Sequence, residues 1–182
     1  RDNSKVQEAI FSSLFPKHPY GTQTVLGTQE NLKNPSITNI KNYYKQWYVP
    51  NNMAICMSGD LDPDATIALI DKYFGGLKPN PELPKLDLPK EAPITQPVVK
   101  EVLGPDAESV ALAWRFPGVS DKDFEILQVV SQVLYNGKAG LIDLDLNQQQ
   151  KVLNSYGYPM GLADYSALLL GGLPKQGQTL EE

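Results

Sequence analysis

The chain has 182 residues and a formal net charge of −5; 41% of its residues are hydrophobic and 20% are charged. This composition is typical of a folded chain, and the length allows one domain or two small ones. The acidic balance argues against a nucleic-acid partner, and no apolar run approaches the roughly 20 residues that span a bilayer. With a single cysteine no internal disulfide is possible, so the cysteine content leaves the cellular compartment open.

The first predicted element is a helix that ends before Pro16, with Ser4 and Gln7 placed as a capping box at its start. The residues from Pro16 to Asn34 are rich in Gly, Thr and Asn, which predicts an irregular loop. The apolar residues of the helix recur at helical spacing and are Val6, Ile10, Phe11 and Leu14.

A second helix is predicted to begin with Thr38 as its N-cap and to end before Pro50. Its apolar stripe is wide enough to face a core, so we interpret the stripe as core packing rather than as an aromatic binding platform. The stripe consists of Ile40, Tyr43, Tyr44, Trp47 and Tyr48.

A buried strand and a third helix are predicted next. The run Met53–Met57 is continuously apolar, which is typical of a strand covered on both faces, and Cys56 within it is expected to be buried and inert. Asp62 caps the helix that follows, with Pro63 at its first position, and Gly75-Gly76 is expected to end it in a left-handed conformation. The core face of this helix carries Ile67, Ile70 and Phe74.

Six prolines lie between Pro79 and Pro97, where they remove backbone donors and exclude both a helix and a central strand. This segment is predicted to be an extended, semi-rigid linker. It divides the chain into residues 1–78, the linker 79–97 and residues 98–182.

The part after the linker alternates between strands and helices. Residues 98–103 and 110–116 read as two strands joined by a turn at 104–106, and a helix beginning at Ser120 to Asp123 ends at Asn136-Gly137. A shorter helix is expected around 141–149, followed by a strand pair at 156–162 and 165–170.

Residue chemistry alone assigns no catalytic or metal-binding residue. His18 is the only imidazole, so no multi-histidine zinc site can form within the chain, and we interpret it as an ordinary loop histidine. Glu8 is not at a ligand spacing from it, and no G-x-S-x-G elbow surrounds a serine. Asp60, Asp62 and Asp64 lack the glycine and glutamate of a calcium loop and are interpreted as helix-capping residues.

A run of short motifs nevertheless resembles one family. His18-Pro19-Tyr20-Gly21, Leu26-Gly27-Thr28, Trp47-Tyr48-Val49-Pro50-Asn51-Asn52-Met53, Ser58-Gly59-Asp60-Leu61-Asp62 and Lys72-Tyr73-Phe74-Gly75 follow one another in this order. Their order and spacing resemble those of the pitrilysin (insulinase) family of zinc metallopeptidases, which includes the mitochondrial processing peptidase. The resemblance covers nearly the whole chain and weakens after Lys138, where Leu141 to Gln150 replace an arginine-rich helix.

The resemblance implies an α+β fold in which antiparallel sheets are flanked by helices, as in a metalloprotease lobe. Residues 1–78 then correspond to the C-terminal half of the preceding, catalytic lobe, and residues 98–182 to the N-terminal half of the next. The family binds zinc through H-x-x-E-H and a downstream glutamate. H-x-x-E-H is absent here, the glutamate is expected before Arg1, and neither Glu8 nor Glu30 replaces it.

The function implied is that of a fragment of a zinc-dependent metalloendopeptidase that hydrolyses peptides. The chain is expected to supply scaffold and inter-lobe linker without binding zinc, which belongs to the parent protein. Its expected partners are a peptide substrate and the remaining lobes or a homologous subunit. Two alternatives stay open: a non-catalytic family member acting as a structural subunit, and a free-standing interaction module.

Both ends of the chain are interpreted as cuts in a longer protein. Residue 1 is an arginine, and Thr179 to Glu182 read as the capping box of a helix that is just beginning. Because half-lobes leave strand edges unpaired, we also expect the chain to associate with a second copy.

Overall fold

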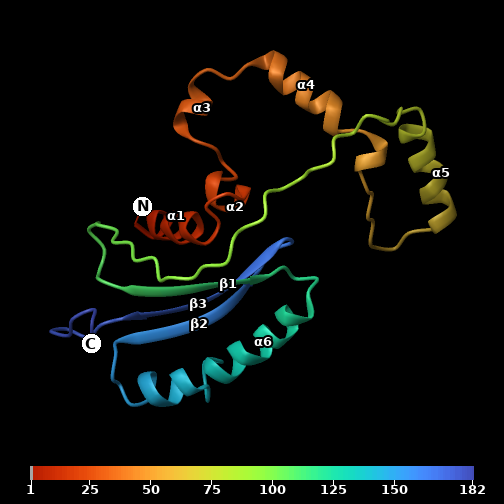
Figure 1. Cartoon of the computed structure of the whole chain (residues 1–182). Helices are drawn as coiled ribbons and strands as arrows, with labels where there is room; N and C mark the ends of the chain where they lie inside the picture. Colours follow the sequence, from red (N-terminus) through yellow and green to blue (C-terminus); the bar gives the residue numbers. More distant parts are fainter. Residues whose placement is uncertain (1) are drawn as a thin grey trace. The chain divides into compact units, whose positions relative to one another are not determined.

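The computed structural model describes residues 2–182, which form two compact units (Figure 1). The sheet unit combines the residues up to Gln23 with Pro89–Glu182, and the helical unit is Thr24–Leu88. Within the described residues, no helix has both the length and the apolar character needed to cross a membrane.

The sheet unit contains a three-stranded antiparallel sheet with strand order β1-β3-β2. The strands are β1 (Val110–Pro117), β2 (Asn154–Gly161) and β3 (Tyr165–Leu173). The central strand β3 places Leu169 opposite Ala113 on one side and Tyr158 on the other. Helix α1 (Asp2–Leu14) covers one face of the sheet and helix α6 (Lys122–Leu134) the other (Figure 1). The predicted α+β class, with a helix-flanked antiparallel sheet, is confirmed.

The core of the sheet unit lies between the end of α1 and β3. Leu14 and Phe15 are buried against Ala167 and Leu169, which lie on the same face of β3 because strand side chains alternate. The predicted apolar stripe of this helix is confirmed in part, since Ile10 and Phe11 pack on the cluster. The predicted cap is wrong: the helix already includes Ser4, because it begins at Asp2.

On the opposite face, glycines allow α6 and the segment before it to approach the sheet closely. A Cβ atom on Gly161 would lie 2.6 Å from Cζ of Phe124, which is too close, so β2 needs a glycine at this position. Asp121 caps α6 by accepting a hydrogen bond from the N–H of Asp123, which places the cap within the expected start of the helix. Gly137, with φ of +78°, follows the end of α6 at the predicted stop.

The loop after α6 is organised by one buried carboxylate, that of Asp143. Its Oδ2 accepts hydrogen bonds from the N–H groups of Asn136 at 2.9 Å and Gly140 at 3.1 Å. Burial opposes ionisation, but the backbone N–H groups of this loop outweigh it and lower the pKa of Asp143 below its ordinary value. Asp143 also begins the π-helix η2 (Asp143–Asn147), which continues the helical residues 141–142 and confirms the short helix expected around 141–149, although it ends at Asn147.

The helical unit contains α3 (Gln29–Lys33), α4 (Ile37–Trp47), the 3₁₀ turn η1 (Pro50–Asn52) and α5 (Pro63–Phe74). Asp62 caps α5 as predicted, since its carboxylate accepts the N–H of Ala65 at 2.8 Å. Two predicted details are wrong. Ser36 rather than Thr38 caps α4, and Gly75 is right-handed, with φ of −61°.

The apolar faces of the helical unit are exposed in this chain. Tyr43 and Tyr44 of α4 are about three-fifths exposed, and neither α4 nor α5 has a buried residue. Residues 53–57 run extended without a strand partner, and Cys56 is exposed. The expected burial of these residues is therefore wrong for this chain. A strand needs a neighbour to satisfy its backbone groups, and no other strand of the described residues pairs here. Residues 98–103 likewise form no strand.

The start of the linker is attached to the helical unit through Asn80. Its N–H donates to Oδ1 of Asn51 at 3.0 Å, and Nδ2 of Asn51 donates back to the carbonyl of Asn80 at 2.8 Å. The Asn80 side chain also donates to the carbonyl of Gln46. These bonds use Gln46 in the last turn of α4 and Asn51 in η1, so the first linker residues are part of the helical unit.

The lowered pKa of Asp143 predicts a specific pH dependence of stability. The pKa of Asp143 is lower in the folded chain than in the unfolded chain. The stabilisation is therefore complete above about pH 3.8, the ordinary pKa of the group, and is lost as the pH falls through the pKa of the folded chain. Asp143→Asn should therefore be less stable than the wild type near neutrality, and the difference should shrink in acid. Urea unfolding at a series of pH values measures this. The exposed Asp145→Asn is the matched control and should track the wild type; a constant gap between Asp143→Asn and the wild type at every pH would contradict the account.

Candidate functional site

Within the sheet unit, the proline-rich segment is fixed by the buried carboxylate of Glu91. The side chain is 1% exposed, and its Oε1 accepts hydrogen bonds from the N–H groups of Lys17 at 2.6 Å and His18 at 2.7 Å. The N–H of Glu91 itself donates to the phenol oxygen of Tyr165 at 2.8 Å. Glu91 therefore binds the turn after α1 through its side chain and β3 through its backbone.

Arg115 on β1 completes this arrangement. Its guanidinium donates to the carbonyls of Leu14 and Ala92 and lies over the ring of Tyr165, 5.5 Å from the centroid. Its Nη1 is 3.9 Å from Oε2 of Glu91, too far for a hydrogen bond but close for two opposite charges that are almost fully buried. We call Glu91, Arg115 and Tyr165, with the backbone groups they bind, the clasp. It joins four segments that are distant in sequence: the end of α1 with the turn after it, the proline-rich segment, β1 and β3.

His18 lies beside the clasp and is buried, with 1% of its surface exposed. It caps the short helix α2 (Pro19–Thr22), because its Nδ1 accepts the N–H of Tyr20 at 3.2 Å. Its ring contacts those of Phe15, Tyr20 and Tyr165. The interpretation as an ordinary loop histidine missed this burial. The Ser/Thr/Asp/Asn preference of N-caps gives no signal for a histidine cap.

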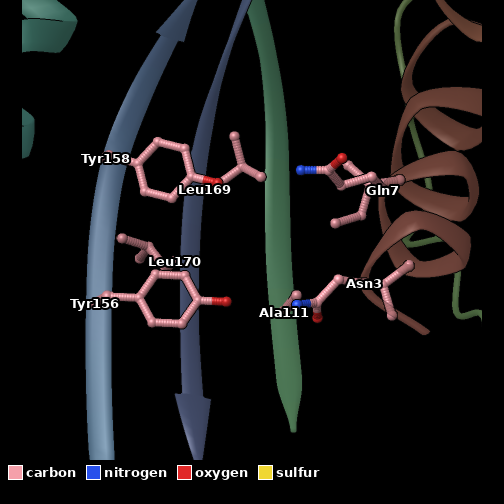
Figure 2. Close-up of a pocket in the computed structure, with 9 residues that line it drawn as sticks. Asn3, Gln7, Ala111, Tyr156, Tyr158, Leu169 and Leu170 are labelled. Carbon is pink, nitrogen blue, oxygen red and sulfur yellow. The ribbon is translucent and has the colours of Figure 1, made fainter. Parts of the chain in front are cut away.

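A second feature of the sheet unit is a cavity of about 290 Å³ between α1 and the sheet (Figure 2). The carboxamides of Asn3 and Gln7 extend into it from α1, and the rings of Tyr156 and Tyr158 line it from β2. The two tyrosine rings are stacked with centroids 6.2 Å apart. Tyr156 lies across Gly171, where a Cβ atom would be 2.4 Å from the ring.

The chemistry of this cavity is uncharged. Among residues 3–182, whose side chains the structure describes, no acidic or basic residue lines it, and apolar residues such as Leu169 form its floor. Burial raises the pKa of Tyr156, and the neighbouring Tyr158 raises it further, so the phenol keeps its proton at neutral pH. The cavity can accept an apolar group or a neutral hydrogen-bonding group, and it offers no ligand set for a cation.

The residues considered for metal binding are not brought together. Glu8 is exposed on α1, and Glu30 on α3 pairs with Lys33 at 2.6 Å. Across residues 3–182, whose side chains the structure describes, no three His, Cys, Asp or Glu side chains are grouped as a metal site requires. The assignment of zinc binding and catalysis to residues outside this chain stays a prediction.

The clasp predicts a large effect of one substitution. Glu91→Ala leaves the N–H groups of Lys17 and His18 without their acceptor and Arg115 without a counter-charge, so the free energy of unfolding should fall by about 3–5 kcal/mol. Urea unfolding followed by circular dichroism measures the change. Glu82→Ala removes an exposed linker carboxylate and should stay within about 0.5 kcal/mol of the wild type. Equal effects of the two substitutions would show that the clasp does not stabilise the fold.

With the geometry described, comparison with known proteins identifies relatives. The family description "Peptidase M16 inactive domain" matches residues 36–176. The zinc protease PqqE of Helicobacter pylori is 28% identical over 172 residues, which cover 91% of this chain and 38% of that protein. The probable mitochondrial-processing peptidase subunit beta of Schizosaccharomyces pombe is 29% identical over 85 residues, 47% of this chain and 18% of that protein. The chain thus spans less than two-fifths of the length of either relative.

Solved structures share the fold. A protease from Helicobacter pylori superposes with a TM-score of 0.74 at 24% identity, covering 95% of this chain and 43% of that one. The first half of the periplasmic protease PqqL from Escherichia coli gives 0.61 at 18% identity, covering 96% and 39%. A chain of Complex III2 from Candida albicans gives 0.65 at 18% identity, covering 97% and 43%. Because the family match spans well over half of the chain, this protein belongs to the peptidase M16 family, which is the pitrilysin-like family that its sequence motifs resemble.

Proposed function

We propose that the chain is the non-catalytic part of a zinc-dependent metalloendopeptidase that hydrolyses peptides. It supplies scaffold and the inter-lobe linker, while the zinc and its ligands belong to other parts of the parent protein. The family match to an inactive domain and the relatives named as zinc proteases support this proposal. The share of those relatives that the chain covers, 38% of PqqE, leaves room in a parent of that length for a catalytic half.

The clasp is the observation that carries the linker role. In the proposed parent, residues 1–78 complete the preceding lobe, residues 79–97 connect the lobes, and residues 98–182 begin the next. Glu91 lies within this connection and binds residues 17 and 18 on one side and Tyr165 and Arg115 on the other. A connection bound in this way transmits the position of one segment to the other, as an inter-lobe linker requires.

A second candidate is a family member that has no catalytic zinc at all and serves as a structural subunit. One chain with this fold is part of Complex III2 from Candida albicans. The two candidates differ in the parent sequence. H-x-x-E-H followed by a downstream glutamate, ahead of residue 1, favours the peptidase, and a parent without them favours the subunit.

The scaffold role predicts that the isolated chain neither holds zinc nor cleaves peptides. The purified chain should contain well under one zinc per molecule after equilibration with zinc and gel filtration, as measured by mass spectrometry. A library of quenched fluorescent peptides should show no hydrolysis that a chelator abolishes. Stoichiometric zinc together with chelator-sensitive cleavage would overturn the proposal.

The linker role predicts an effect on activity in the intact protein. Replacing Pro84 and Pro89 by glycine loosens the connection, because proline restricts the backbone and glycine frees it. The peptidase activity should fall while the zinc content stays unchanged. The control is Pro105→Gly, an exposed proline beyond the linker. If the linker variant keeps full activity, the connection has no role in catalysis.

A further inference from the structure

The hydrogen bonds around His18 define its neutral form. Its Nδ1 accepts the N–H of Tyr20 at 3.2 Å, so Nδ1 carries no proton and the proton of the neutral ring is on Nε2. His18 is also the single histidine of the chain. The tautomer therefore follows from the cap of α2.

The opposite ring nitrogen has no hydrogen-bond partner although it is buried. His18 Nε2 is the one buried side-chain nitrogen or oxygen without a partner among the residues that the structure describes. The carboxylate oxygen Oδ2 of Asp164, in the turn between β2 and β3, is 3.5 Å away, beyond hydrogen-bond distance. A buried N–H group without an acceptor destabilises the fold while the ring is neutral. A small movement of the ring toward Asp164 would give Nε2–H an acceptor.

The charges that face this ring favour a cation. Asp164 accepts a hydrogen bond from the hydroxyl of Tyr20 at 3.2 Å, but among residues 3–182 no lysine or arginine is seen in an ion pair with it. The carboxylate of Glu91 lies on the backbone side of His18, where Arg115 already balances it. The ring of Tyr165 contacts the imidazole of His18 and the guanidinium of Arg115, and its hydroxyl accepts the N–H of Glu91. The cluster thus has two carboxylates and one cation while His18 is neutral.

From this geometry we infer that His18 is a proton-binding switch at the edge of the clasp. When a proton from solvent binds Nδ1, the imidazolium moves toward Asp164 and forms a charge-assisted hydrogen bond through Nε2–H. The same proton turns Nδ1 from an acceptor into a donor, so the N–H of Tyr20 loses its partner. On acidification His18 therefore loses its hydrogen bond to the Tyr20 N–H, which caps α2, and gains an ion pair with Asp164 in the β2–β3 turn. This inference does not depend on the proposed peptidase role.

The rest of α2 should survive the exchange. The N–H groups of Gly21 and Thr22 donate to the carbonyl of His18 at 3.0 and 3.2 Å, and neither bond involves the imidazole. The change is therefore confined to the Tyr20 amide and the imidazole. This separates the switch from general acid unfolding.

Nuclear magnetic resonance of the whole chain tests the switch, because a single histidine gives one set of imidazole signals. Over a series of pH values between about 8 and about 5, the Tyr20 amide signal should move in parallel with the imidazole signals. Its hydrogen exchange, corrected for pH, should rise about tenfold, as expected for the loss of one hydrogen bond. The Gly21 and Thr22 amides should not change in parallel.

Two variants and a control decide the mechanism. Asp164→Asn removes the counter-charge at an exposed position, 47% exposed, and should shift the coupled change to lower pH. His18→Gln should leave the Tyr20 amide insensitive to pH over this range. Asp87→Asn removes one exposed carboxylate in the linker and should behave as the wild type. A Tyr20 amide that stays constant through the imidazole titration, or an Asp164→Asn variant indistinguishable from the wild type, would overturn the inference.

Discussion

The sheet unit depends on one buried carboxylate, that of Glu91. A charged group with 1% exposure is tolerated only where its oxygens are satisfied, and here the backbone of residues 17 and 18 and the guanidinium of Arg115 provide that compensation. Arg115 is buried under the same condition, because the carbonyls of Leu14 and Ala92 accept its protons. Each segment of the clasp therefore depends on the others. This mutual dependence explains how a proline-rich segment with no secondary structure is held against the end of α1.

The helical unit shows the opposite situation. Its helices are capped by Asp62 and Ser36, whose side chains accept hydrogen bonds from N–H groups of the first turn. Their apolar faces are not buried, since Tyr43, Ile67 and similar residues remain more than half exposed. Local hydrogen bonding can define a helix, but burying its apolar face requires a second layer. For a chain that spans 38% of the relative PqqE, this contrast supports the proposal that the missing layer belongs to the parent protein.

Much of the sheet unit was predictable from sequence because its signals are local. The spacing of Ile10 and Leu14, the alternation around Trp114 and the Asn136-Gly137 stop each indicate one element, and the structure confirms them. The clasp was not predictable, because Glu91 lies 73 residues from His18 and nothing in the linker distinguishes its buried carboxylate from an exposed one. The predicted strands at 53–57 and 98–103 were wrong for a related reason. Their composition suits a strand, but pairing depends on a neighbour that local sequence does not specify.

Hydrogen exchange at two amides tests the central claim most directly. Lys17 and His18 lie in a turn outside any regular helix or strand, so Glu91 is the acceptor that accounts for protection of their N–H groups. The account predicts that both amides exchange as slowly as those of the central strand β3, and that both become fast in Glu91→Gln, whose uncharged amide binds them more weakly. Fast exchange of these two amides in the wild-type chain would contradict it.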